Sequence, residues 1–153
     1  MKDTLKGRTV GILIHDGSSA RSVARLRKDL EKAEATVLIV ATKIEGTILD
    51  DETVCLANGL LAGTPSVFFD AVALILSEEA GKMLASESAA VDFVRDAYGH
   101  LKALAVDDGG HTLLTTVGIE DDEFVIDASD TTDFIRAAMT RLWSREPAVR
   151  NLA

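Results

Sequence analysis

One stretch of the chain places reactive side chains where a strand turns sharply into a helix. The apolar run Ala103–Val106 breaks into Asp107-Asp108-Gly109-Gly110, and helical spacing resumes at Leu113 and Leu114. In open α/β sheets such a turn often holds a ligand or a reactive group, because the helix N-terminus offers unpaired N–H groups and a positive dipole end. An enzyme of this kind would have its nucleophile at Asp107, and no Ser or Cys stands beside that carboxylate.

The carboxylate of Asp107 supports two interpretations. A thiolate at a helix N-terminus has a lowered pKa and attacks carbonyl groups, whereas a carboxylate is a poor nucleophile toward amides and aldehydes. Asp107 could still form ester intermediates if His111, one helical turn further on, served as the base. We favour the alternative that Asp107 and Asp108 accept hydrogen bonds from the N–H groups that open the helix, which stabilises it by roughly 1 kcal/mol.

A second candidate site follows the first apolar run, Arg8–His15. The turn Asp16-Gly17-Ser18-Ser19-Ala20-Arg21 contains a glycine, two hydroxyls and an arginine at the start of a helix, which are the parts of an anion-binding cradle. It has neither the spacing of a phosphate-binding P-loop nor a GxGxxG motif. Gly17, Ser18, Ser19 and Arg21 therefore remain a candidate small-anion site, with ordinary helix capping as the favoured interpretation.

Other reactive residues show no pattern of a site. The three histidines have no metal-ligand spacing, and the acidic run Asp50-Asp51-Glu52 is typical of a solvated turn, so we expect no metal and no cofactor. The single cysteine, Cys55, excludes an internal disulfide and is expected to pack as a small apolar residue in a reducing compartment.

Length and charge exclude several classes of function. With 153 residues, 47% of them hydrophobic, the chain is long enough for one core. A net charge of −9 and a pI of about 4.7 disfavour binding to nucleic acid. No signal peptide and no run of about 18 apolar residues is present, so we expect a cytoplasmic protein without membrane contact.

The elements that position these turns alternate between strand and helix. Strands are expected at Arg8–His15, Thr36–Val40, within Ser66–Leu76, at Ala103–Val106 and at Phe124–Ile126, with helical spacing between them and a small hairpin at Gly46–Leu56. Near-continuous apolar strands indicate a sheet covered on both faces. The expected fold is a flavodoxin-like three-layer α/β/α sandwich with a mostly parallel sheet. Glu34 stands where the first helix should end with a glycine, and a left-handed conformation there would cost about 1 kcal/mol.

Three blocks of sequence, in this order and spacing, resemble a known family. They are Gly7–Leu13, Thr64–Val72 and Phe93–Lys102. From Lys6 to about Trp143 the chain is similar to the C-terminal domain of large-subunit catalases, which belongs to the class I glutamine amidotransferase-like superfamily together with PfpI-type proteases and related glyoxalases. The resemblance implies a domain at residues 1–143 followed by a C-terminal tail at 144–153. It implies no peroxide chemistry, because the haem pocket of catalases belongs to a different, β-barrel domain.

The catalytic residues of active superfamily members have no counterpart in this chain. Those members have a Cys in an Ala-Ile-Cys-Ala-Gly type motif, and here Ala105–Gly109 matches it with Asp107 in the place of the Cys. Their partner Glu is missing from the first turn. Their oxyanion Gly pair after the third strand is replaced by Leu76-Ser77-Glu78-Glu79.

These observations predict a non-catalytic, catalase-associated domain that acts by self-association or by binding another protein, in a stabilising or chaperone-like role. Trp143, the apolar last helix and the tail are the expected contact surface. The expected partners are a second copy of the chain and a haem catalase subunit. The alternatives are a residual hydrolase or glyoxalase that uses Asp107 with His111, and small-anion binding at the first turn.

Overall fold

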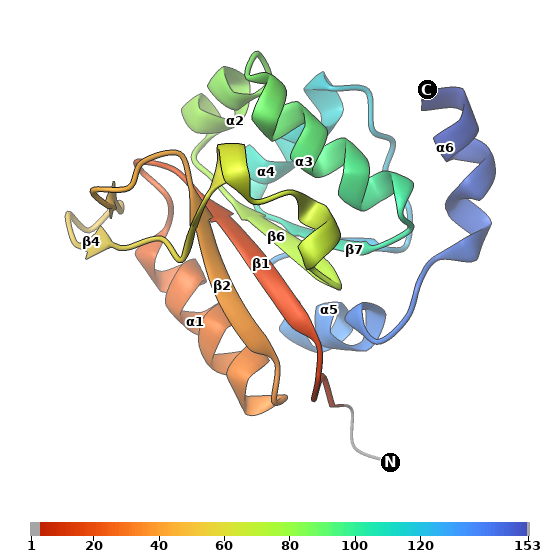
Figure 1. Ribbon diagram of the computed structural model, residues 1–153, viewed down its shortest axis with the longest axis horizontal. Coiled ribbons are helices and arrows are strands. Elements are labelled where there is room, and N and C mark those ends of the chain that lie inside the picture. Colours follow the sequence, from red (N-terminus) through yellow and green to blue (C-terminus); the bar gives the residue numbers. More distant parts are fainter. Residues whose placement is uncertain (1–3, 153) are drawn as a thin grey trace.

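A parallel six-stranded sheet forms the centre of the molecule. A computed structural model describes residues 4–152 and orders the sheet β5-β2-β1-β6-β7-β8, every strand parallel to its neighbours (Figure 1). The strands are β1 (Thr9–Ile14), β2 (Thr36–Ala41), β5 (Gly59–Leu60), β6 (Ala71–Ile75), β7 (Ala103–Val106) and β8 (Val125–Asp127). The expected α/β fold with a parallel sheet is confirmed.

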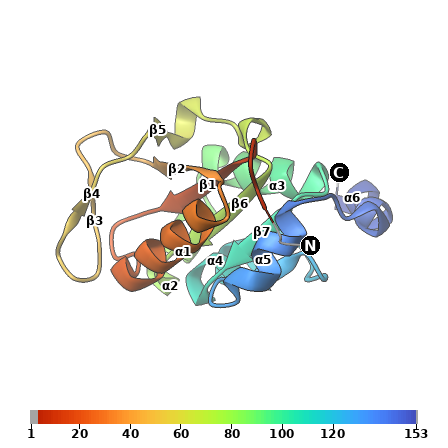
Figure 2. The same ribbon diagram turned by 90° about the horizontal axis from the view of Figure 1, so that it is seen from below.

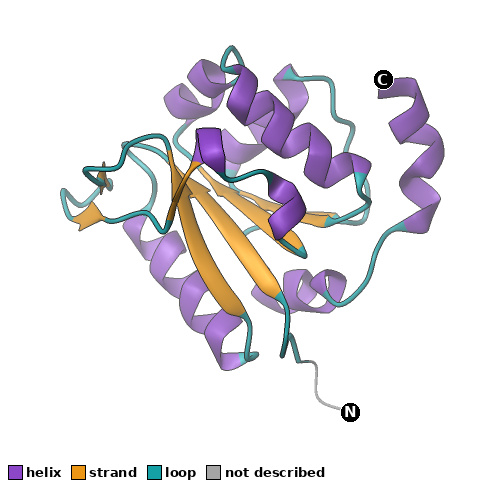
Figure 3. Ribbon diagram, viewed as in Figure 1, coloured by secondary structure: helices purple, strands orange, loops and turns teal. Residues whose placement is uncertain are grey.

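Helices cover both faces of this sheet, as Figures 2 and 3 show. They are α1 (Ala20–Lys32), α2 (Glu78–Leu84), α3 (Ser88–Gly99), α4 (Asp108–Thr116), α5 (Thr131–Ala138) and α6 (Glu146–Leu152). Side chains of α1 and α5 pack in one core with Ile12 and Ile14, whereas α2, α3 and α4 pack in a second core with Leu13. Alternate strand residues therefore enter opposite layers, which is why the strands are apolar almost throughout.

The hairpin lies at one edge of the sheet. β3 (Thr47–Ile48) and β4 (Val54–Cys55) pair antiparallel, with Ile48 opposite Val54, which confirms the expected hairpin. Figures 1 and 2 show it standing out from the body of the molecule beside the start of α1. Asp50 in its turn reaches back to that helix, where its carboxylate accepts a hydrogen bond from the N–H of Ala20 at 2.9 Å.

The conformation of Glu34 was expected from the sequence, whereas the edge strand β5 was not. Glu34 has φ of 73°, the left-handed conformation expected after α1. The short edge strand β5 is not among the strands expected from the sequence, since one of its two residues is a glycine. Asn58 fixes it in place, because its side-chain oxygen accepts from the N–H of Ile39 at 2.7 Å.

The C-terminal segment, expected as a tail from residue 144, forms a packed helix in its described part. Residues Glu146–Leu152 form α6, whose apolar side chains pack against the core that contains α3. Arg145, only 3% exposed, anchors the segment: its guanidinium lies 2.7 and 3.0 Å from the carboxylate oxygens of Asp122 and 4.3 Å from the ring centre of Tyr98. None of the helices within residues 4–152 has both the length and the apolarity to cross a lipid bilayer.

Candidate functional site

Asp107 occupies the turn between β7 and α4, as the sequence predicted. It is the N-cap of α4, and its Oδ1 accepts a hydrogen bond from the N–H of Gly110 at 2.9 Å. Both carboxylate oxygens also lie 3.1 Å from the N–H of Leu76, which directly follows β6. The side chain therefore joins the ends of two neighbouring strands.

The N–H of Leu76 lies at the end of β6, where the expected oxyanion Gly pair is replaced by Leu76 and Ser77. This N–H donates to the carboxylate of Asp107. A reacting oxyanion would have to displace this carboxylate.

The backbone at the turn is relaxed and closely packed. Asp107 has φ of −93° and ψ of −169°, an extended conformation without the strain of a nucleophile elbow. Gly109 and Gly110 are required by contact with β6: an added Cβ would lie 2.1 Å from the carbonyl oxygen of Leu76 at Gly109 and 2.4 Å from that of Leu74 at Gly110. These glycines allow α4 to approach the strand end and leave no room for substitution.

Burial sets the protonation tendency of Asp107. Desolvation raises the pKa of its carboxyl above the usual value, and the hydrogen bonds from the Gly110 and Leu76 backbone act in the opposite direction. A raised pKa is a property of many catalytic acids and of many buried structural carboxyls, so the geometry of the neighbouring groups has to decide between them.

The imidazole of His111 does not bind the carboxylate of Asp107; a backbone hydrogen bond from the N–H of His111 to the carbonyl oxygen of Asp107, at 2.8 Å, joins the two residues. Its Nε2 lies 2.9 Å from both carboxylate oxygens of Asp121, and 46% of its side chain is exposed. The imidazole is thus held by the loop before β8. Within residues 4–152 no hydrogen bond joins it to the carboxylate it was expected to assist.

A shallow hollow of about 320 Å³ does open above the turn. It is lined by Glu78, Val106, Asp107, Asp108, His111, Thr112, Asp121, Val125 and Asp127. Five of these residues are acidic, but in the part of the chain that the structure describes no three His, Cys, Asp or Glu side chains converge to hold a metal ion. The hollow is acidic and polar, and Asp107 and His111 share it without pairing.

The donors of the first turn are engaged by the protein. Ser18 is fully buried, and its Oγ lies 2.9 Å from the N–H of His15 and 2.5 Å from the carbonyl oxygen of Ile75. The hydroxyl of Ser19 caps α1 by accepting a hydrogen bond from the N–H of Ser22. The N–H of the next residue, Ala20, donates to the carboxylate of Asp50.

The two remaining residues of the proposed cradle are Gly17 and Arg21, and the N–H of Gly17 is also used within the protein. Gly17 adopts φ of 89° and donates its N–H to the carbonyl oxygen of Ile48 at 2.8 Å, and Arg21 is exposed. The geometry favours capping over anion binding. The sequence could not indicate that Asp50 and Ile75 would take part, because they are distant along the chain and acquire these contacts only through the fold.

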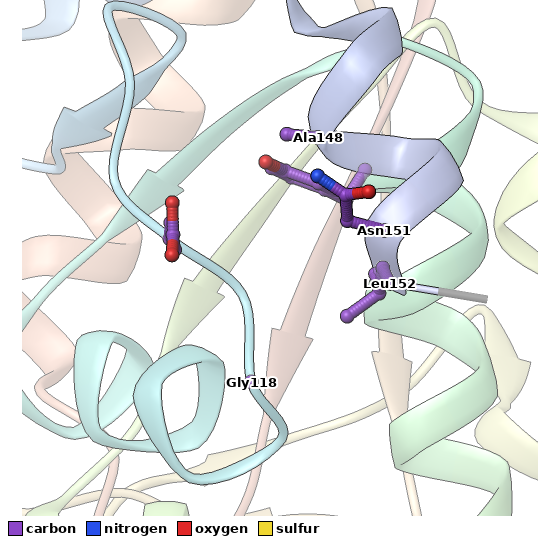
Figure 4. Close-up of a pocket in the computed structure, with 6 residues that line it drawn as sticks. Gly118, Ala148, Asn151 and Leu152 are labelled. Carbon is purple, nitrogen blue, oxygen red and sulfur yellow. The ribbon is translucent and has the colours of Figure 1, made fainter.

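Two further features lie outside these turns: a buried lysine and a second hollow. Lys102 is 2% exposed and its Nζ donates to the carbonyl oxygen of Ser66 at 3.0 Å; burial lowers the pKa of its ammonium group. A second hollow of about 150 Å³ lies under α6, where Asn151 and Leu152 face the loop at Gly118 (Figure 4). Neither feature had a sequence signal.

Comparison with known proteins identifies what the chain is similar to. Residues 6–145 match the model of the C-terminal domain found in long catalases. Catalase C of Rhizobium meliloti is 34% identical over 151 residues, which cover 95% of this chain and 21% of that protein. Catalase HPII of Pseudomonas putida is 28% identical over 148 residues, covering 94% of this chain and 20% of that protein. The chain therefore spans about a fifth of the length of these relatives.

Solved structures confirm the fold at low sequence identity. A DJ-1 superfamily protein from Salmonella typhimurium, solved as a Cys-to-Ala mutant, superposes with a TM-score of 0.70 at 16% identity, covering 94% of this chain and 95% of that one. Oxidized DJ-1 of Toxoplasma gondii gives a TM-score of 0.69 at 13% identity, covering 95% of this chain and 96% of that one. The resemblance inferred from the three sequence blocks is confirmed.

Proposed function

This chain belongs to the family of C-terminal domains found in long catalases, and we propose that it acts by association, without a reaction of its own. Its partner is a second copy of itself or a haem catalase subunit, and its effect is to stabilise that partner or to keep it from aggregating. The catalase names of its relatives motivate the choice of a haem subunit for testing.

The observation on which this proposal depends is the state of Asp107. Its oxygens accept hydrogen bonds from the N–H groups of Gly110 and Leu76, so the position that would hold a nucleophile serves as a helix cap. His111, the one base expected nearby, is bound to Asp121 instead. A nucleophile needs an adjacent base within hydrogen-bond reach, and neither group supplies one to the other.

Exposed apolar side chains support association. Trp143, a contact residue expected from the sequence, is 74% exposed although it lies two residues before the buried Arg145. A large aromatic side chain in that setting is typical of an interface anchor.

The proposal is tested by measuring mass and binding in solution. Analytical ultracentrifugation of the chain alone, and with a long catalase truncated before its C-terminal domain, should show either a self-associated species or a complex. The truncated catalase should also lose peroxide turnover more slowly on heating when the chain is present. A chain that stays monomeric, leaves the truncated catalase unbound and leaves its heat inactivation unchanged refutes the proposal.

A second function is supported by the hollow over the turn, because both Asp107 and His111 line it. Release of His111 from Asp121 could direct its imidazole toward a substrate bound there, which corresponds to the hydrolase or glyoxalase alternative. That alternative requires Asp107→Asn to abolish turnover of an ester or dicarbonyl substrate. Equal turnover by the two proteins removes it.

A further inference from the structure

Exposed apolar side chains concentrate on the hairpin and the segment around it. Of the nine exposed large apolar residues among residues 4–152, five lie between positions 44 and 60: Ile44, Ile48, Val54, Leu56 and Leu60. Side chains of this type scattered singly need no explanation, whereas a cluster on a projecting element indicates an interaction surface. We call residues 44–56 the hairpin surface.

A groove runs between the hairpin surface and α1. It has a volume of about 690 Å³ and is lined on the helix side by Ala20, Val23 and Ala24 and on the hairpin side by Val54 and Leu56. The small helix residues leave space that side chains of another protein could fill. Charged and polar side chains line the groove as well, namely Arg27, Glu31, Asp51, Thr53 and Asn58, so its lining is mixed.

The two elements that border this groove have exposed charges of opposite sign. On α1, Arg21, Arg25, Lys28 and Lys32 recur at intervals of four, three and four residues, so they form one exposed stripe. None of the four makes an ion pair with another described residue. The helix holds five of the chain's 16 basic residues and only two of its 25 acidic ones.

The hairpin surface has the opposite sign. Glu45, Asp51 and Glu52 are exposed there, and Glu52 is at the turn with φ of 70°. The hairpin surface is therefore acidic and the exposed face of α1 is basic, on the two elements that border the groove.

We propose that this face binds a second copy of the chain, in a two-fold dimer in which each hairpin surface lies against α1 of the other copy. A two-fold axis pairs the same patch with itself, so a patch must be complementary to its own rotated image. Here rotation places the acidic strip on the basic stripe twice, and brings the apolar residues of the two hairpins together at the centre. The inference rests on the proposed function, of which it names the partner and the surface.

The test reverses each strip separately in the full chain. Analytical ultracentrifugation of the unaltered chain should show a dimer. Arg21→Glu with Arg25→Glu, and separately Glu45→Lys with Glu52→Lys, should each weaken dimerisation by at least tenfold. The matched control is Lys6→Glu with Lys82→Glu, which changes the same amount of charge at exposed positions outside the face and should leave the dimer intact.

Restoration separates specific pairing from a general effect of charge. An equimolar mixture of the two reversed variants should form a heterodimer, because each copy then offers the strip that the other lacks. Circular dichroism checks that every variant remains folded.

Each other outcome overturns the inference. A monomeric chain excludes the second copy as the occupant, and the binding to truncated catalase then decides the proposed function on its own. A dimer that survives both reversals uses a different surface, which leaves self-association standing and refutes this face. Two weakened variants that fail to combine refute the two-fold arrangement.

Discussion

At the residue scale, the carboxylate of Asp107 has a structural role that follows from its two hydrogen-bond donors. Its oxygens accept two backbone N–H groups, one at the start of α4 and one at the end of β6. Oδ1 accepts from both Gly110 and Leu76, whereas Oδ2 adds only a second contact to Leu76. A single well-placed oxygen can therefore satisfy both donors.

This geometry predicts different costs for two substitutions at position 107. Asp107→Ala should lower the free energy of unfolding by about 1–2 kcal/mol, because both N–H groups lose their acceptor. Asp107→Asn should cost under about 0.5 kcal/mol, because the amide oxygen replaces Oδ1 and Asn is an equally good N-cap. Urea unfolding at neutral pH measures both. Equal costs for Ala and Asn would show that the carboxylate, and not the cap, is needed.

The raised pKa of Asp107 gives this comparison a pH dependence. Because the pKa of the carboxyl is higher in the folded state than its ordinary 3.8, the folded state binds the proton more tightly than the unfolded state. The contribution of Asp107 is thus most favourable below pH 3.8 and declines as pH rises through the folded-state pKa. As pH rises from 3.8 through the folded-state pKa, the Asp107→Asn protein should therefore become more stable relative to the unaltered chain. Urea titrations at a series of pH values would show this change. A difference that is constant with pH contradicts burial as the dominant cause.

At the element scale, α6 depends on one side chain. Arg145 fills a buried position with hydrogen bonds to Asp122 and to the carbonyl oxygens of Tyr98 and Lys102. The helix itself has no fully buried residue. The C-terminal segment is therefore expected to detach when the guanidinium is removed.

Arg145→Ala should lower the free energy of unfolding by about 3 kcal/mol, because it removes the cationic partner of the partly buried Asp122 carboxylate, which keeps only the N–H of Phe124, together with a donor to the carbonyl oxygens of Tyr98 and Lys102. Amide hydrogen exchange should accelerate throughout α6 and remain unchanged in β1. Arg150→Ala is the matched control, since Arg150 forms only an exposed pair with Glu146 and should cost under about 0.5 kcal/mol. Unchanged exchange in α6 would mean that its apolar contacts alone hold it.

At the scale of the whole molecule, the sequence predicted what depends on local pattern. Strand and helix positions, the hairpin and the left-handed Glu34 follow from periodicity and turn chemistry, and Asp107 at the strand–helix turn follows from the break at Val106. What it missed depends on contacts between distant segments. Three such contacts join residues at least 23 positions apart: Asp107 with Leu76, Asp50 with Ala20 of α1, and Arg145 with Asp122.

Charge is also distributed unevenly over the whole chain, with net charge −9 overall and a basic stripe confined to α1. If the stripe meets the acidic hairpin of a second copy, the exposed charges at the edge of the contact are screened by salt, since the Debye length falls from about 10 Å at 0.1 M to about 3 Å at 1 M. The dimer dissociation constant should therefore increase several-fold between 0.05 and 0.5 M NaCl, as sedimentation at graded concentrations would measure. If apolar side chains alone made the contact, the dissociation constant would stay the same or decrease with salt, because the like charges of two acidic copies repel least at high salt. The direction of the salt effect thus distinguishes a charge-complementary face from the exposed Trp143 surface.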